Sequence, residues 1–281
     1  MFHRRNPCDL RRVRRAADRI LKRHRGILRV NNDILTQLVA LSNQLGRPEN
    51  DYVILGEGNT SARADAESFY VKASGTELRT ITASGFVHVS FQRVLALMER
   101  QDLSDADVKA GLIAAKMDPT YPSHPSVETL LHGLCLNLPG INFVGHTHPV
   151  AVNSVTCSAA FDNAFAGRLF PDEIVLCGPA PVTVPYTDPG VPLARETYGR
   201  IQTYIREHND LPRIILIQNH GLIALGKTAQ QVADTTAMAV KTARILVGTY
   251  AAGGPRFLSP KDVARIHTRP DELYRREKLG I

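Results

Sequence analysis

Val144-Gly-His-Thr-His-Pro-Val150 is the stretch of sequence on which the interpretation of the whole chain depends. The apolar run over residues 141–144 predicts a strand, and residues i and i+2 of a strand point to the same side. His146 and His148 would therefore leave the end of this strand on one side, where two imidazoles can bind one metal ion. The alternative is a pair of surface or capping histidines that bind nothing.

A third histidine has the same local setting far downstream. His220 follows another apolar run, over residues 214–217, and precedes Gly221. A catalytic zinc site takes about three protein ligands and keeps one position open. We therefore predict that His146, His148 and His220 bind one divalent ion.

The composition is that of a globular α/β protein. The chain has 281 residues, of which 43% are hydrophobic and 22% charged, so one sizeable core is available. No run approaches the roughly 18–20 apolar residues of a membrane span, and we expect no membrane association. The four cysteines, Cys8, Cys135, Cys157 and Cys177, show no C-x-x-C spacing. This predicts reduced thiols and a cytoplasmic location.

The net charge of +7 comes from one end of the chain. Residues 1–30 hold eleven basic and two acidic side chains, whereas the rest holds 23 basic and 25 acidic ones. The main body therefore gives no reason to expect nucleic-acid binding. We interpret residues 1–31 as a basic N-terminal arm. A targeting peptide, an upstream extension, a polyanion-binding or subunit-contacting arm and a peripheral helix all remain open for it.

Hydrophobic periodicity predicts helices alternating with short strands and no linker that would split residues 32–281, so we expect one domain. Helices are expected over residues 33–45, 91–100, 105–117, 126–136, 149–158, 193–208 and 228–250, and in the tail after Ser259. Strands are expected over residues 52–55, 69–73, 86–89, 141–144, 173–177, 182–184, 214–217 and 222–225. Ser126, Thr228 and Ser259 are the expected N-caps of their helices.

Two turns rich in small residues could bind an anion. They are Gly56-Glu-Gly-Asn-Thr-Ser61 and Ser74-Gly75-Thr76, each next to an expected strand. Their backbone N–H groups and hydroxyls can face an oxyanion. Ordinary hairpin turns have the same composition.

Glu128 is the candidate acid/base group. With Ser126 as N-cap it would lie in the first turn of its helix, where the dipole favours a carboxylate; a purely structural role would need no more than that. Together, metal, base and anion-binding turns indicate an enediolate-type reaction, in which the ion stabilises the charge left when a C–C or C–H bond breaks. Amide hydrolysis is the competing use, but the sequence contains no His-Glu-x-x-His motif.

In combination and order, five segments resemble the class II aldolase/adducin family. They are Gly58-Asn59-Thr60-Ser61, Ala73-Ser74-Gly75-Thr76, Pro125-Ser126-Val127-Glu128, His146-Thr147-His148 and Asn219-His220-Gly221. The resemblance covers roughly residues 33–254. It implies a single-domain α/β/α sandwich around a central, mainly antiparallel sheet, and it implies a homotetramer.

The resemblance also implies roles for particular residues. His146, His148 and His220 would bind Zn²⁺, or Mn²⁺ or Co²⁺ as in some members. Glu128 would be a metal ligand in the empty enzyme and the general base once substrate displaces it. The substrate anion would be bound by Asn59, Ser74, Gly75 and Ser126.

Two departures from the family pattern bear on the substrate. Val127 stands where sugar-phosphate aldolases have a second serine, which leaves open whether the anion is a phosphate or a carboxylate. The tyrosine that some aldolases use as proton donor has no assignable match; Tyr186 and Tyr274 are the available ones.

The expected function is therefore a metal-dependent lyase that cleaves a C–C bond of a small hydroxy-ketone, sugar phosphate or sugar acid. A decarboxylase of a 2-oxo or aromatic acid is the first alternative. A non-catalytic, adducin-like interaction module is the second, and the intact histidine set argues against it.

Overall fold

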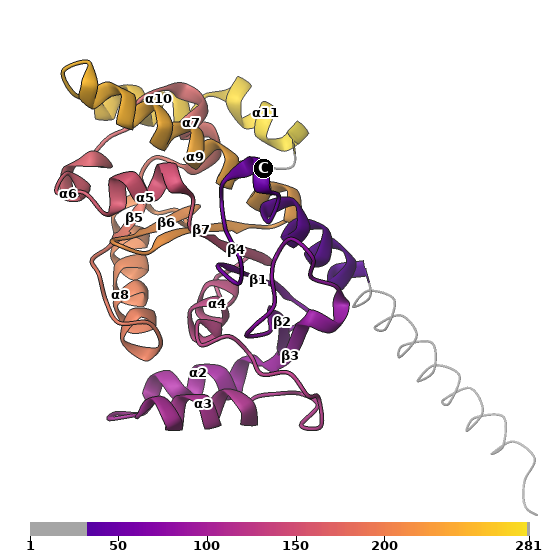
Figure 1. Ribbon diagram of the computed structural model, residues 1–281. Coiled ribbons are helices and arrows are strands. Elements are labelled where there is room, and N and C mark those ends of the chain that lie inside the picture. Colours follow the sequence, from indigo (N-terminus) through magenta and orange to yellow (C-terminus); the bar gives the residue numbers. More distant parts are fainter. Residues whose placement is uncertain (1–32, 280–281) are drawn as a thin grey trace, which may run out of the picture.

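A seven-stranded mixed sheet forms the centre of the protein, whose computed structural model describes residues 33–279 (Figure 1). The strand order is β3-β2-β1-β4-β7-β6-β5, and every neighbouring pair is antiparallel except β5 and β6. The strands are β1 (Asn59–Arg63), β2 (Ser68–Lys72), β3 (Phe86–Ser90), β4 (Phe143–Thr147), β5 (Val182–Val184), β6 (Ile214–Ile217) and β7 (Gly221–Gly226). The expected basic arm over residues 1–31 lies outside the described residues.

The sheet separates two apolar cores because its side chains alternate between its faces. On β7, Ile223 and Leu225 belong to one core, whereas Leu222 and Ala224 belong to the other. Both faces of this strand are buried, which explains why the central strands are continuous apolar runs rather than alternating ones. On β4, His146 lies two residues after Val144, so the two side chains point to the same face of the sheet. Val144 packs in the first core, and this is therefore the face on which His146 lies.

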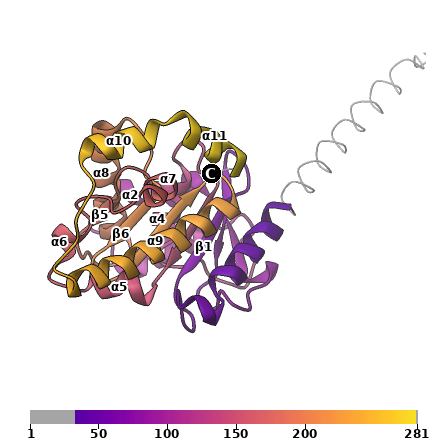
Figure 2. The same ribbon diagram turned by 90° about the horizontal axis from the view of Figure 1, so that it is seen from above.

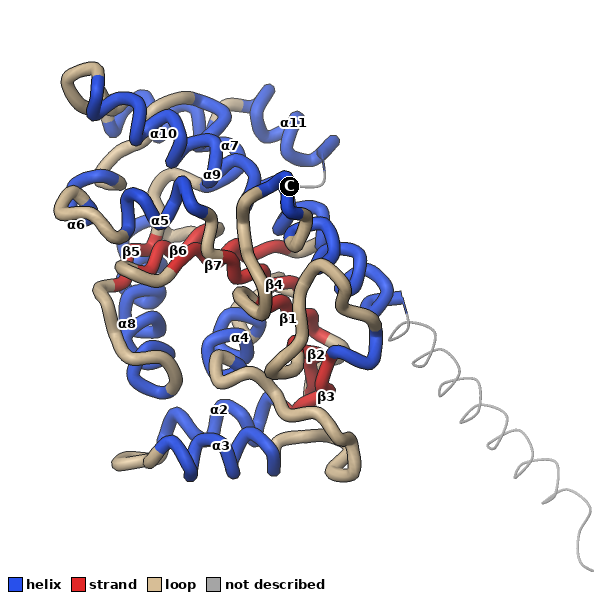
Figure 3. The backbone as a smooth tube through the Cα atoms, in the orientation of Figure 1, coloured by secondary structure: helices blue, strands red, loops and turns tan. Residues whose placement is uncertain are grey.

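Helices cover both faces and complete the expected α/β/α sandwich (Figures 2 and 3). One layer contains α2 (Phe91–Glu99), α3 (Asp105–Ala114), α4 (Thr129–Leu136) and α8 (Val191–His208). The other contains the helix over residues 33–45, α5 (Val150–Thr156), α7 (Pro171–Cys177) and α9 (Ala229–Ala251). The short elements η1 (Pro48–Asn50), η2 (Ala83–Gly85) and α6 (Phe161–Ala164) lie in connections, and α10 (Pro260–Thr268) and α11 (Pro270–Leu279) end the described chain.

Side-chain caps begin several helices where the sequence predicts them. Thr228 Oγ1 accepts a hydrogen bond from the backbone N–H of Gln231 at 3.1 Å, and Ser259 Oγ accepts one from Asp262 at 3.2 Å. Each satisfies one of the unpaired N–H groups of a first helical turn. Both expected N-caps are confirmed.

Residues 173–177, expected as a strand, form helix α7, so this prediction was wrong. Pro171 stands at the helix start, where a fixed φ and a missing N–H cost nothing, and Asp172 and Glu173 occupy the first turn. Both features favour a helix start. They outweigh the β-branched residues that suggested a strand.

The segment that precedes the glycine-rich turn also differs from the prediction. Residues 52–55 form no strand, and Leu55 has a positive φ of 51°. The strand lies just downstream instead: β1 begins at Asn59, inside the expected anion-binding loop, and pairs with both β2 and β4. Small polar residues concealed this strand because propensity scales disfavour Asn and Ser in a sheet.

Ser126 is not the N-cap of the helix that follows it. Helix α4 begins at Thr129 with Glu128 as the N-cap residue, and Ser126 Oγ accepts a 3.3 Å hydrogen bond from the Glu128 N–H in the preceding turn. Glu128 therefore precedes the first turn rather than lying in it. This shift lets its side chain turn away from the helix axis towards β4.

Cys135, Cys157 and Cys177 are free thiols, as expected, and Cys8 lies outside the described residues. Within residues 33–279, no helix has the length and apolar character to cross a membrane.

Candidate metal centre

Three histidine side chains converge at one end of the two central strands. His146 lies on β4, His148 just beyond its end, and His220 in the turn between β6 and β7. His146 Nε2 is 2.9 Å from His148 Nε2 and 3.2 Å from His220 Nε2. The sequence prediction that these three histidines meet therefore agrees with the geometry, in which one ligand atom of each lies within 4.8 Å of the others.

Two small residues permit this close approach. A Cβ atom at Gly221 would lie 2.5 Å from the Thr147 carbonyl oxygen and 2.8 Å from His148 Cδ2, so a larger side chain would displace the histidine strand. At Gly58, which has a φ of 65°, a Cβ would lie 2.6 Å from the His146 carbonyl oxygen. Asn153 then fixes the β6–β7 turn by donating a 3.1 Å hydrogen bond to the carbonyl of His220.

The ring protons of His146 can be assigned from its partner. Its Nδ1 is 3.0 Å from the carbonyl oxygen of Leu222, which only accepts hydrogen bonds, so Nδ1 carries the proton and Nε2 presents a lone pair. Burial lowers the pKa of both His146 and His148 to about 4. A histidine backed by a backbone carbonyl, with its Nε2 lone pair directed towards two further imidazoles, fits the ligand set of a divalent ion such as Zn²⁺.

The Glu128 carboxylate faces the same point from the N-cap position of helix α4. Its Oε1 is 3.1 Å from His220 Nε2 and 3.5 Å from His146 Nε2, while its Oε2 accepts a 2.5 Å hydrogen bond from Asn59 Nδ2. Burial acts to raise the pKa of Glu128, but His146, His220 and the Asn59 amide outweigh it and hold the pKa below its ordinary value. The group is therefore ionised at neutral pH and able to accept a proton.

The expected anion-binding residues fall into two places. Asn59 contacts Glu128 and lies 3.4 Å from Ser126 Oγ, so both belong to the metal centre. Ser74 and Gly75 lie exposed on the turn after β2, where Ser74 N–H donates to the carbonyl of His124. Ser74 also lines a cavity of about 730 Å³ that lies between α3, the loop over residues 124–127 and the start of α8.

Two further buried residues of the centre were not predicted as site residues. His132 contacts Ser61 and Asn59. Lys72 is almost completely buried on β2, and its Nζ donates a 3.0 Å hydrogen bond to the carbonyl of Gly56. Burial lowers the pKa of Lys72, although the nearby Glu128 and Glu77 carboxylates oppose this. The sequence signal that could have identified Lys72 is the presence of a lysine within an otherwise apolar strand.

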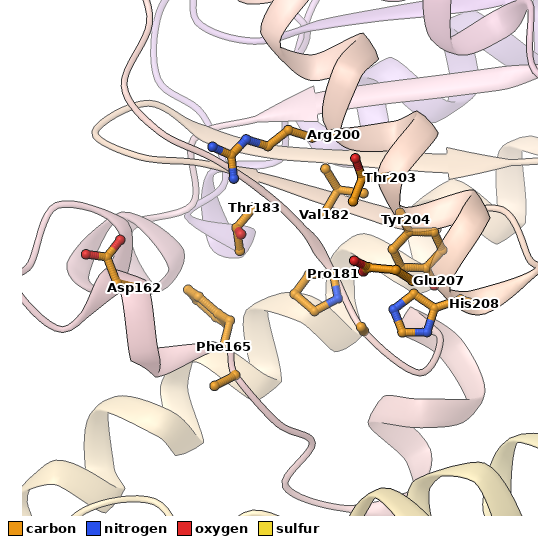
Figure 4. A pocket seen from close by; sticks show the side chains of 12 residues that line it. Asp162, Phe165, Pro181, Val182, Thr183, Arg200, Thr203, Tyr204, Glu207 and His208 are labelled. Carbon is orange, nitrogen blue, oxygen red and sulfur yellow. The ribbon is translucent and has the colours of Figure 1, made fainter.

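A second cavity, of about 410 Å³, lies at the far edge of the sheet between α6, β5 and α8 (Figure 4). Arg200, Tyr204 and His208 are among its lining residues, but it contains neither Glu128 nor any of the three converging histidines. Arg200 is engaged by Glu196 at 2.7 Å. The groups that can carry out chemistry together are therefore those of the metal centre.

Comparison with known proteins agrees with the fold. The sequence model described as Class II Aldolase and Adducin N-terminal domain matches residues 36–247. The chain belongs to the class II aldolase/adducin family.

Individual relatives differ in their named activities. The uncharacterized oxidoreductase YuxG of Bacillus subtilis is 30% identical over 202 residues, which are 69% of this chain but only 27% of that protein. The chain thus spans about a quarter of the length of that relative. The 3-oxo-tetronate 4-phosphate decarboxylase of Haemophilus influenzae is 25% identical over 230 residues, 80% of this chain and 94% of that one.

A solved structure provides the corresponding match in three dimensions. The N-terminal class II aldolase domain of a Thermoplasma acidophilum protein has 28% sequence identity and a TM-score of 0.59. The match covers 75% of this chain and 92% of that one.

Proposed function

We propose that this protein is a divalent-metal-dependent lyase that cleaves a C–C bond of a small, anionic hydroxy-ketone, sugar phosphate or sugar acid. The observation that carries the proposal is the convergence of His146, His148 and His220 beside a buried carboxylate, Glu128. Family membership supports a lyase. The three imidazoles would hold Zn²⁺, with Mn²⁺ or Co²⁺ as the other candidates.

When bound, the ion would act as a Lewis acid towards carbonyl and hydroxyl oxygens. The residues of the chain supply the rest. In the cleavage direction, the fragment released as aldehyde loses its hydroxyl proton, and the electron pair of the broken C–C bond stays on one carbon of the ketone fragment. Glu128, which is ionised, would accept a proton and deliver one to that carbon. Asn59, Ser126 and the Ser74-Gly75 turn would bind the anionic end of the substrate and thereby orient it towards Glu128.

The test is a metal and product assay on the full chain. Purified protein is stripped with a chelator, reloaded with Zn²⁺, Mn²⁺ or Co²⁺, and given a panel of hydroxy-ketones, sugar phosphates and sugar acids. We expect aldehyde release that vanishes on chelation and returns with metal. His220→Ala, which removes one ligand, should lose both metal and activity. A metal-free protein indifferent to chelation would contradict the proposal and favour a non-catalytic interaction module.

A decarboxylase is the second candidate, because a relative of similar length carries a decarboxylase name. Loss of CO₂ would leave a carbanion of the same kind, which Glu128 could protonate. Measuring CO₂ and aldehyde in parallel over the same panel separates the two reactions.

Assembly and domain organisation complete the proposal. We propose a homotetramer in the cytoplasm, formed by the domain over residues 32–281, with residues 1–31 as an appended basic arm. Light scattering on the full chain and on a variant lacking residues 1–30 tests both points. A variant with unchanged mass per assembly and unchanged turnover would identify the arm as dispensable for the reaction.

A further inference from the structure

His132 is completely enclosed beneath the metal centre, where it connects β1 to the candidate base. Its Nδ1 lies 2.6 Å from Ser61 Oγ, and its Nε2 contacts Asn59 Oδ1. The other end of the Asn59 side chain, Nδ2, lies 2.5 Å from Glu128 Oε2. Ser61, His132, Asn59 and Glu128 therefore form one continuous chain of side-chain hydrogen bonds, and all four are buried.

With a neutral His132 ring, only one arrangement of protons satisfies this chain. An ionised carboxylate can only accept, so Asn59 must present its NH₂ group to Glu128 and its carbonyl oxygen to His132. His132 Nε2 must then carry a proton, and a neutral ring leaves Nδ1 to accept from the Ser61 hydroxyl. Burial lowers the pKa of His132 to about 4, which agrees with a neutral ring.

The opposite orientation of the amide would be costly. It would place the Asn59 carbonyl oxygen against the Glu128 carboxylate and two N–H groups against His132, leaving buried acceptors in contact with each other. An unsatisfied buried acceptor costs about 1–3 kcal/mol, and more when it is charged. The proton on His132 Nε2 therefore determines that the NH₂ group of Asn59, and not its carbonyl oxygen, faces Glu128.

We propose that His132 is a positioning residue for the lyase reaction, acting through Asn59. In its Nε2–H form it fixes the Asn59 amide, which in turn holds Glu128 Oε2. Glu128 Oε1 is then left directed at His220 and His146, where a proton can be transferred. The inference rests on the proposed role of Glu128 as the base.

The ring state of His132 can be measured without any assay of activity. In ¹⁵N-histidine-labelled full-length protein, two-dimensional NMR distinguishes protonated from unprotonated ring nitrogens, and comparison with His132→Gln identifies the signals of this residue among the ten histidines. We expect a neutral ring protonated at Nε2. A ring protonated at Nδ1, or at both nitrogens, at neutral pH would overturn the inference.

Kinetics then test the positioning role. His132→Gln keeps an N–H group close to the position of Nε2, whereas His132→Leu fills similar space without a donor. By analogy with losses seen for outer-shell partners of metal sites, we expect Leu to lower kcat by about 10- to 100-fold. KM and metal content should stay within about twofold, and Gln should recover most of the loss. Equal losses in the two variants, or loss of metal, would indicate a merely structural histidine.

Ser61→Ala provides a second route should His132→Leu fail to fold. It removes the donor to Nδ1 and leaves the ring in place, so kcat should fall by a smaller factor and the proportion of the Nε2–H form should fall with it. Loss of kcat without a change in the ring state would contradict the inference. Failure of the positioning role can also be told apart from failure of the proposed function. If Glu128→Gln were inactive and His132→Leu fully active, only the positioning role would be excluded.

Discussion

Among the residues whose burial the structure describes, two glutamates, Glu128 and Glu173, are buried, and their surroundings differ in a way that separates structure from chemistry. Glu173 Oε1 is 2.8 Å from the buried guanidinium of Arg168, and its Oε2 accepts a 2.7 Å hydrogen bond from the Leu169 N–H. Arg168 donates its remaining hydrogen bonds to the carbonyls of Cys177 and Gly178. This carboxylate has a permanent countercharge, and each of its two oxygens accepts a hydrogen bond from the protein.

Glu128 has no such partner. One of its oxygens is held by an amide, while the other faces the imidazoles of His220 and His146. Its charge is thus balanced by hydrogen bonds within the protein and, as we propose, by an ion and a substrate. A buried carboxylate with a complete set of protein partners stabilises the fold, whereas one with an incomplete set can exchange partners during a reaction.

The same substitution at the two glutamates should have opposite effects. Glu128→Gln removes the proton acceptor at nearly constant volume, and general acid/base groups contribute about 10²- to 10⁴-fold to rate. We therefore expect kcat to fall by that factor while the protein stays folded and metal-loaded. Glu173→Gln is the matched control, with reduced stability and an unchanged kcat per folded, metal-bound molecule. Retained turnover in Glu128→Gln would exclude it as the base.

Breaking the structural pair from its other side should destabilise the fold strongly. Arg168→Met leaves Glu173 buried without a countercharge, which costs about 3–5 kcal/mol in comparable pairs. The free energy of unfolding in urea should fall by that amount. Combining it with Glu173→Leu should restore much of the loss, because replacing both charges is far less costly than removing one. If Arg168→Met alone were as stable as the unsubstituted protein, solvent or another group would have to compensate the charge of Glu173.

Acid should destabilise the folded chain through His132, which lies beneath the metal centre. The pKa of His132 is about 4 in the folded chain against an ordinary value of 6.5, so the unfolded chain binds the extra proton between these values. Stability is therefore fully present above about pH 6.5 and falls as the pH drops towards 4, by up to roughly 3 kcal/mol for this residue. Urea unfolding of metal-free protein against pH measures the slope. It should be shallower in His132→Gln; an equal slope would assign the effect to other groups.

The smallest expected effect concerns the anion. Val127→Ser restores a hydroxyl next to Ser126, and a single additional hydrogen bond contributes about 1 kcal/mol. KM for a phosphorylated substrate should then fall by roughly five- to tenfold, with little change for an unphosphorylated acid. Val127→Ala is the control for lost volume. Equal changes for both substrate types would indicate that this position does not contact the anion.

Much of the site could be predicted because the alternation of side chains between the two faces of a strand can be followed from residue spacing alone. The spacing of His146 and His148 gives their common direction, and the family resemblance connects them with His220 across the sequence. The fold class followed from the same resemblance together with the alternation of apolar runs. Both predictions agree with a structure in which β4 and β7 are adjacent.

The errors arose where tertiary packing decides. β1 has polar residues that ordinarily mark a turn, yet it pairs on both sides because β2 and β4 flank it. The helix over Pro171–Cys177 does carry local start signals, Pro171 and two acidic residues in its first turn, but its β-branched residues favoured a strand. His132 lies four residues after Glu128, a spacing that places two side chains side by side on a continuous helix. Its actual partners are on β1, and only the three-dimensional pairing of β1 with the α4 layer could show this.

The most direct test of the account is the metal content and ligand environment of the purified full-length protein. Elemental analysis with X-ray absorption at the metal edge should find close to one divalent ion per chain, bound by three imidazole nitrogens, and His148→Ala should lower that number. Protein that binds no ion after reloading, or an ion with no imidazole ligand, would contradict the central claim that His146, His148 and His220 form one metal centre.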